Sequence, residues 1–212
     1  MLEHVPAWLG RLLADRRAGM DKIVAARPDM AGAAGTALAL TSPAFADGAR
    51  LPERFTADAA GNGGVSPPLT WTGAPAGARL ALIVEDPDAP ASQPLVHAIV
   101  WGLEGDSGRI AEGALSGDVA ETPADDGLVR GRNSFLRTGW LPPDPPTGHG
   151  EHRYAFQLFA VGPDAPDPGE APGRNALLGS LAGQVLASDV LIGTYSRGEA
   201  APVGPAGVAQ PA

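Results

Sequence analysis

The chain has 212 residues, a formal net charge of −9, 44% hydrophobic residues and no cysteine. This length fits one domain with a short extension, and the 29 glycines and 22 prolines exclude a long helical bundle. The absence of cysteine excludes a disulfide scaffold, a thiolate metal site and a cysteine nucleophile, and the acidic balance disfavours a general nucleic-acid binder.

The first 28 residues are predicted to contain an amphipathic helix over residues 5–26. Apolar side chains recur there at helical spacing, and Arg27 and Pro28 suit the end of a helix. We expect the stripe to dock on its own domain or on a second copy in a homodimer. A membrane surface or partner protein is the alternative, which the weak positive bias of the segment disfavours. The stripe consists of Val5, Trp8, Leu9, Leu12, Leu13, Met20, Ile23 and Val24.

Residues 22–46 imitate a secretory signal peptide, with basic residues, an apolar run over 31–40 and an A-x-A sequence at 44–46. However, the apolar run is mostly Ala and Gly, and Pro28-Asp29 interrupts the segment between the basic residues and this run. The run is also far shorter than the roughly 20 residues that a spanning helix needs. We therefore expect a cytoplasmic protein with no integral membrane association.

The remaining chain reads as short strands separated by turns. A linker is expected over 29–36, a β-rich domain over 37–198, and a disordered tail over 199–212. One later helix is expected over 174–187, so the fold class is mainly β with few helices. The strands are expected at 37–40, 53–56, 69–72, 79–85, 96–103, 152–161 and 189–195.

Two segments could carry chemistry. Asp86-Pro87-Asp88-Ala89-Pro90 follows a strand directly and forms a stiff, acidic loop. The run 142–154 combines four prolines and two glycines with a cluster of donor side chains. His97 begins another apolar strand. Two histidines at the starts of predicted strands, together with two Asp and one Tyr, favour a polar pocket. The donors of the run are His149, His152, Arg153 and Tyr154.

Residues 38–198 resemble the bacterial, Raf-kinase-inhibitor-like branch of the phosphatidylethanolamine-binding protein family. The signatures DPDAP and GxHRY carry most of the resemblance by their order and spacing. The matching motifs are Ser42-Pro43-Ala44-Phe45, Ser66-Pro67-Pro68-Leu69 with Trp71, Asp86-Pro87-Asp88-Ala89-Pro90, Val96-His97, Gly131-Arg132-Asn133, the run from Gly148 to Tyr154, and Gly193-Thr194-Tyr195.

This resemblance implies an antiparallel sheet packed on a smaller second sheet, with helices at the edges. It also implies a small anion pocket at one end of the sheet and, near the first signature, a cis bond before Pro90. Imidazolium and phenol donors suit phosphate or carboxylate oxygens, whereas an Asp would accept from a histidine ring. The implied ligand-binding residues are Asp86, Asp88, His97, Pro145, Pro146, Gly148, His152 and Tyr154.

The chain departs from the family pattern at the pocket rim, where Leu141, Pro142 and Asp144 replace small residues. Two further positions also differ: Leu136 stands where Gly is usual, and Ala98 follows His97 in place of Trp. These departures affect the expected shape of the rim and leave the expected fold unchanged.

The sequence therefore predicts a non-catalytic protein that binds a phosphate headgroup or a similar small anion, without a cofactor. One alternative is a regulator that inhibits a protease or kinase with the pocket rim. Two hydrolase alternatives rest on weaker patterns. His149-Gly150-Glu151-His152 offers metal ligands, but alternate strand residues face opposite sides. Gly105-Asp106-Ser107-Gly108 imitates a serine-nucleophile loop, without the other motifs of such enzymes.

Overall fold

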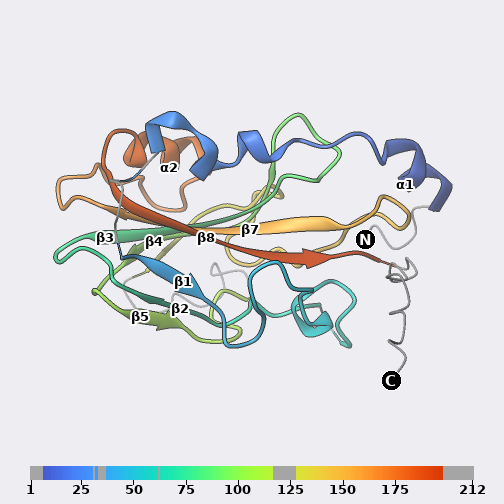
Figure 1. The fold of residues 1–212 in the computed structure, drawn as a ribbon, viewed down its shortest axis with the longest axis horizontal. Helices are drawn as coiled ribbons and strands as arrows, with labels where there is room; N and C mark the ends of the chain where they lie inside the picture. The colour runs from blue at the N-terminus through green and yellow to red at the C-terminus, as the bar shows by residue number, and fades with distance from the viewer. Residues whose placement is uncertain (1–6, 31, 33–36, 62, 117–127, 198–212) are drawn as a thin grey trace, which may run out of the picture.

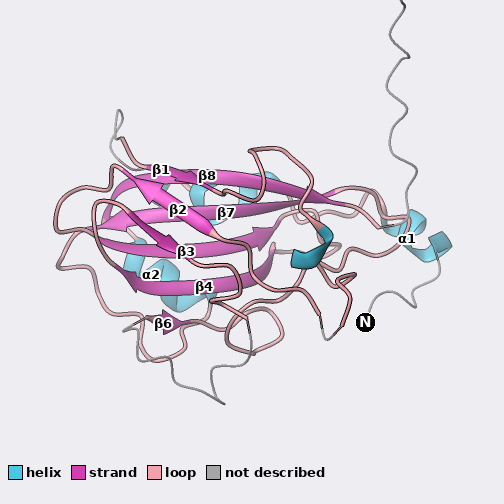
Figure 2. Ribbon diagram, turned by 90° about the horizontal axis from the view of Figure 1, so that it is seen from below, coloured by secondary structure: helices cyan, strands magenta, loops and turns pink. Residues whose placement is uncertain are grey.

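The computed structural model describes residues 7–30, 32, 37–61, 63–116 and 128–197, and all statements below concern these residues. They form two antiparallel sheets and two short α-helices, which confirms the mainly β fold class (Figures 1 and 2). The larger sheet has the order β6-β4-β3-β7-β8 and the smaller sheet the order β1-β2-β5. The strands are β1 (Ala39–Thr41), β2 (Leu69–Thr72), β3 (Arg79–Asp86), β4 (Leu95–Leu103), β5 (Gly108–Ile110), β6 (Val129–Arg130), β7 (His152–Val161) and β8 (Val185–Tyr195).

The larger sheet is buried on both faces, which explains its nearly continuous apolar strands. Along β3, Leu80 and Leu82 pack with the smaller sheet in one core cluster. Ala81 and Ile83, which alternate with them, pack with α2 (Arg174–Leu181) in a second cluster. Two layers thus cover the larger sheet, and no strict alternation of polar and apolar residues is needed.

Most strands were predicted within a few residues of their observed bounds. The predictions for 69–72 and 152–161 match β2 and β7, whereas β5 and β6 were not predicted. The strand predicted at 53–56 is wrong, because Glu53–Phe55 forms a 3-10 turn that buries Phe55. The helix predicted at 174–187 ends at Leu181, since Gly183 takes a left-handed conformation (φ 69°) and β8 follows.

The single N-terminal helix predicted over 5–26 is wrong. Within the described residues, α1 covers only Ala7–Leu13. Gly19 has φ 110°, which no helical residue adopts, and three separate 3-10 turns follow it. These turns are Met20–Lys22, Val24–Ala26 and Pro28–Met30.

The turns that follow Gly19 dock on the larger sheet of the same chain. The backbone N–H of Val24 donates to Glu85 Oε2 (2.8 Å), and that of Ala25 donates to Gln157 Oε1 (2.7 Å). Figure 1 shows this segment running along the larger sheet, on the side away from β1 and β2, to α1 at the end where β8 terminates. Trp8 and Leu12 do not dock on their own domain, since they are 64% and 72% exposed in the single chain, and their docking on a second copy stays a prediction.

Other expectations of chain organisation stay open. The tail 199–212 and residues 31 and 33–36 of the expected linker lie outside the described residues. The domain boundaries therefore stay predictions. In the part of the chain that the structure describes, no helix has the length and apolar character to cross a membrane.

Candidate functional site

Polar side chains collect at one end of the larger sheet, where β3 ends and β4 and β7 begin. Asp86 is the last residue of β3, His97 lies near the start of β4, and His152 opens β7. Because β3 lies between β4 and β7 and is antiparallel to both, these positions meet at one end of the sheet. Tyr154 shares the face of His152, since alternate strand residues point the same way. All four side chains are buried, and the structure brings these four predicted site residues together.

Asp86 and His152 form a tightly held pair. His152 Nδ1 lies 2.7 Å from Asp86 Oδ2, and the backbone N–H of Asp88 donates to Asp86 Oδ1 (2.8 Å). The other ring nitrogen of His152, Nε2, lies 2.7 Å from Nδ1 of His149. Nε2 of His149 in turn faces the backbone oxygens of Leu13 (2.8 Å) and Arg16 (3.2 Å). A chain of hydrogen bonds thus runs from Asp86 through two histidines to the N-terminal segment.

The hydrogens in this chain of hydrogen bonds can be counted from its three links. Each of its three links needs one hydrogen, because two lone pairs cannot share a contact. Two neutral imidazoles supply two of these hydrogens, and the third lies between Asp86 and His152 Nδ1. Burial and the neighbouring His152 lower the pKa of His149. His149 therefore donates from Nε2 to the N-terminal segment and accepts at Nδ1 from the Nε2–H of His152.

His97 and Tyr154 present two polar atoms without a partner. Their rings meet edge-on with centroids 5.1 Å apart. His97 Nδ1 donates to the backbone oxygen of Leu141 (2.6 Å), which leaves Nε2 for another partner. Both His97 Nε2 and the Tyr154 hydroxyl are buried and have no hydrogen-bond partner among the described residues. Such atoms are rare in folded proteins, because an unmade buried hydrogen bond costs roughly 1–3 kcal/mol.

Burial sets the charge of these two groups. It lowers the pKa of His97, although the nearby Asp86 acts in the opposite direction. It also raises the pKa of Tyr154 well above its ordinary value, and Asp86 adds to this shift. Near neutral pH, His97 Nε2 is therefore an acceptor and the Tyr154 hydroxyl can donate or accept.

Asp88 serves different partners from Asp86. Its carboxylate receives the Arg153 side chain (2.7 and 2.8 Å), the Arg153 backbone N–H (2.8 Å) and Arg17 Nη1 (2.9 Å). Burial acts to raise the pKa of Asp88, but these hydrogen bonds and the positive charge outweigh it and hold the pKa at about 2. Asp88 is thus a permanently ionised clamp beside the site, and a direct role in ligand binding stays a prediction.

The loop before β7 brings the remaining predicted residues to the same end. Pro145 and Pro146 are buried, and the backbone N–H of His149 donates to the oxygen of Pro146 (3.0 Å) to close a turn. Gly148 occupies this turn with φ 84°, a conformation that favours glycine. The peptide bond before Pro90 is trans, so the predicted cis bond is wrong.

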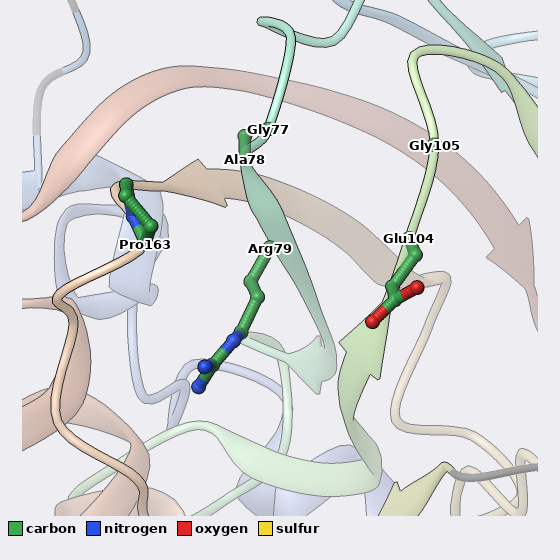
Figure 3. Close-up of a pocket in the computed structure, with 6 residues that line it drawn as sticks. All are labelled: Gly77, Ala78, Arg79, Glu104, Gly105 and Pro163. Carbon is green, nitrogen blue, oxygen red and sulfur yellow. The ribbon is translucent and has the colours of Figure 1, made fainter.

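A pocket of about 300 Å³ lies at the opposite end of the larger sheet (Figure 3). It is lined where β3 begins and where β4 and β7 have ended, by residues that the sequence analysis did not select. The predicted site and this pocket are therefore separate. The lining residues are Gly77, Ala78, Arg79, Glu104, Gly105 and Pro163.

Comparison with known proteins decides the family. The family model described as "Phosphatidylethanolamine-binding protein" matches residues 41–196, a span that contains all four buried site residues. The chain belongs to the phosphatidylethanolamine-binding protein family. A relative from Methanothermobacter thermautotrophicus, named a UPF0098 protein, is 38% identical over 161 residues, which are 75% of this chain and 99% of the relative. The UPF0098 protein Rv1910c of Mycobacterium tuberculosis is 39% identical over 166 residues, 76% of this chain and 71% of that protein.

Two solved structures of the same family share the fold. The homologue CT736 from Chlamydia trachomatis is 33% identical with a TM-score of 0.64, and the match covers 76% of this chain and 99% of that one. Escherichia coli YbcL is 27% identical with a TM-score of 0.65, and the match covers 75% and 98%. The two-sheet architecture is therefore that of the phosphatidylethanolamine-binding family.

A third relative bears on cellular location. A Mycobacterium tuberculosis protein named as the lipoprotein LppC is 43% identical over 122 residues, which are 58% of this chain and 54% of that protein. Since one relative carries a lipoprotein name, the cytoplasmic location expected from the sequence stays a prediction.

Several side chains around the candidate site were not predicted from the sequence. His149 was named as a donor and as a possible metal ligand but not among the ligand-binding residues, and Arg17 was not selected. The contact between Arg197 and Asp144, with the hydrogen bond from Tyr195 to Asp58 Oδ2 (2.8 Å), was also missed. Asp144 and Arg197 both act on the charge of Tyr154. Only the unusual Asp144 signalled this cluster in the sequence.

A metal centre finds no support in the described residues. Within them, no group of three or more His, Cys, Asp or Glu side chains is arranged to hold a metal ion. His149 and His152 bond to each other instead, and their outer nitrogens face a backbone oxygen and a carboxylate.

Proposed function

We propose that this member of the phosphatidylethanolamine-binding family is a non-catalytic protein that binds a small anion beside His97, Tyr154 and the Asp86–His152 pair. The observation that carries the proposal is the neighbouring pair of buried atoms without partners, His97 Nε2 and the Tyr154 hydroxyl. Because buried polar atoms are nearly always hydrogen-bonded, two adjacent exceptions support a ligand site.

The chemistry of these atoms favours a singly protonated phosphate group. Its P–O–H can donate to the neutral His97 Nε2, while another of its oxygens accepts from the Tyr154 hydroxyl. Asp86 is already occupied by His152 and by the Asp88 N–H. Phosphorylethanolamine and inorganic phosphate share this group, so both are suitable probes.

Binding without catalysis is proposed because the site lacks an activated nucleophile. The hydrogen bonds of His97, His149 and His152 run to backbone oxygens, to a carboxylate and to each other. In these described contacts, no serine or threonine hydroxyl is paired with a histidine base, as nucleophilic catalysis requires.

Calorimetric titration of phosphorylethanolamine into Tyr154→Phe tests the proposal. The variant should bind roughly fivefold to tenfold more weakly than wild type, the effect of one lost hydrogen bond. Its free energy of unfolding should not fall, because the hydroxyl has no partner in the protein. Tyr195→Phe is the matched control, since its hydroxyl donates to Asp58 (2.8 Å). It should lose stability and keep the affinity. Equal affinities of wild type and Tyr154→Phe would contradict the proposed site, and release of free ethanolamine would contradict a non-catalytic role.

The proposal also predicts a pH dependence. Since burial lowers the pKa of His97, Nε2 gains a proton only as the pH falls below the ordinary histidine value of about 6.5. Protonation converts Nε2 from an acceptor to a donor. Sulfate, whose charge is constant over this range, should therefore bind more tightly at about pH 5.5 than at about pH 7.5. His97→Asn, which keeps a donor for Leu141, should abolish the difference. A pH-independent sulfate affinity would remove His97 from the site.

A further inference from the structure

We infer that residues 8–19 form a strap that closes the anion site, and that a ligand reaches the site only when this pocket strap lifts. The inference rests on the proposed function, because it concerns access to the same site. It concerns a segment to which the sequence analysis assigned a different structure.

The pocket strap lies directly on the loop that leads into β7. At Gly10, an added Cβ would lie 2.1 Å from the backbone oxygen of Thr147 and 3.0 Å from the backbone nitrogen of His149. No side chain fits at this position, so the backbone of α1 contacts the backbone of the loop. Glycine here permits a closure that any other residue would prevent.

Arg17 ties the pocket strap to both signature segments. Its Nη1 donates to the backbone oxygen of Glu151 (2.9 Å) and pairs with Asp88 Oδ1 (2.9 Å). Its Nη2 donates to the backbone oxygen of His149 (3.2 Å). The next two residues of the strap donate their N–H groups to the oxygens of Ala89 (3.0 Å) and Pro87 (2.8 Å). The strap therefore bridges the two loops that bound the site.

The pocket strap also accepts hydrogen bonds from His149, a side chain that would otherwise be able to donate to an anion. The backbone oxygens of Leu13 and Arg16 accept from His149, and His149 takes the outward nitrogen of His152. As long as the strap is closed, its two backbone oxygens hold the Nε2–H of His149 inside the protein. When the strap lifts, His149 loses its two acceptors, and its Nε2–H becomes available to an anion.

The strap can move while the rest of the N-terminal segment stays docked. Gly19, with φ 110°, ends it, and Val24 and Ala25 are held separately by Glu85 and Gln157. Trp8 and Leu12, on the outer side of the strap, are exposed and therefore do not hold it against the domain.

The pocket strap is an addition to the family fold. The family model begins at residue 41, and three quarters of this chain already cover 99% of the Methanothermobacter relative. The two loops that bound the site are thus held by residues that lie outside the matched domain.

Two variants open the strap in different ways. Gly10→Ala forces α1 away from Thr147 without any change of charge, and Arg17→Ala removes the side-chain link to both loops. Each should raise the affinity for inorganic phosphate roughly tenfold, because binding no longer has to open a closed state. An electrostatic role of Arg17 predicts the opposite, since loss of a cation weakens anion binding.

The controls are Gly179→Ala, where an added Cβ has no atom within 4 Å, and Arg11→Ala, an exposed arginine of α1. Neither should change the affinity.

Hydrogen exchange of the wild-type protein provides a second measurement. Saturating phosphate should accelerate exchange of residues 8–19, including the N–H groups of Ala18 and Gly19, and leave residues 22–25 protected. If wild type, Gly10→Ala and Arg17→Ala bind phosphate equally, or if exchange of the strap does not respond to phosphate, the strap inference is wrong and the proposed function stands. If neither the wild type nor any opened variant binds phosphate, the proposed function fails, and the strap inference fails with it.

Discussion

At the scale of single residues, two carboxylates that are two positions apart have separate tasks. Asp86 orients His152 inside the site, whereas Asp88 neutralises Arg153 and Arg17 at its edge. The two carboxylates have different partners because β3 ends at Asp86 and a turn follows. In this turn the backbone N–H of Asp88 donates to the Asp86 side chain. The sequence selected both residues, but it could not assign a partner to either, since Arg17 lies 71 positions before Asp88 and Arg153 lies 65 positions after it.

Asp88→Asn should lower the free energy of unfolding by about 2–4 kcal/mol near neutral pH, because it leaves two arginines without their carboxylate. The folded-state pKa of Asp88, about 2, lies below its ordinary value of 3.8. The stabilisation is therefore complete above roughly pH 4 and is lost as the pH falls through the folded-state pKa. Urea unfolding should be measured for the wild type and Asp88→Asn between the folded-state pKa and roughly pH 4. The two free energies of unfolding should converge as the pH falls. A difference that does not depend on pH would contradict the assignment.

At the scale of elements, the sheet was predictable and the N-terminal segment was not. Strands such as β7 have continuous apolar runs because both faces are buried, and this signal survives in the sequence. The apolar stripe over 5–26 correctly marked Ile23 and Val24 as buried. It gave the wrong backbone, because the N–H groups of Val24 and Ala25 donate to Glu85 and Gln157 and stabilise turns that spacing alone does not reveal. β5 and β6 are too short to produce a pattern.

Glu85→Gln tests whether this buried group holds the N-terminal turns. Glu85 accepts from Val24 N–H (2.8 Å) and Gln157 (2.8 Å) and pairs with Arg174 (2.6 Å). Removal of its charge should cost about 3–5 kcal/mol of unfolding free energy and expose residues 22–25 to hydrogen exchange. Glu112→Gln is the matched control, because its exposed pair with Arg54 (3.2 Å) should contribute less than about 1 kcal/mol. Similar small losses in both variants would show that Glu85 does not anchor the segment.

At the scale of the whole molecule, the two ends of the larger sheet differ. One end holds the buried histidines under the pocket strap, and the other holds the pocket beside Arg79 and Glu104. The net charge of −9 disfavours the approach of an anion, so affinity must come from short-range hydrogen bonds at the site. The family resemblance selected residues that meet at one end of the sheet, but it could not reveal the strap, which precedes the matched residues. The expected homodimer stays a prediction.

A crystal structure of the full chain with phosphorylethanolamine, obtained with wild type and Gly10→Ala, tests the central claim most directly. The account predicts the phosphate group within hydrogen-bond distance of both His97 Nε2 and the Tyr154 hydroxyl, with residues 8–19 displaced from Thr147. A phosphate bound elsewhere, for example between Arg79 and Glu104, with His97 and Tyr154 still without a partner, would contradict it.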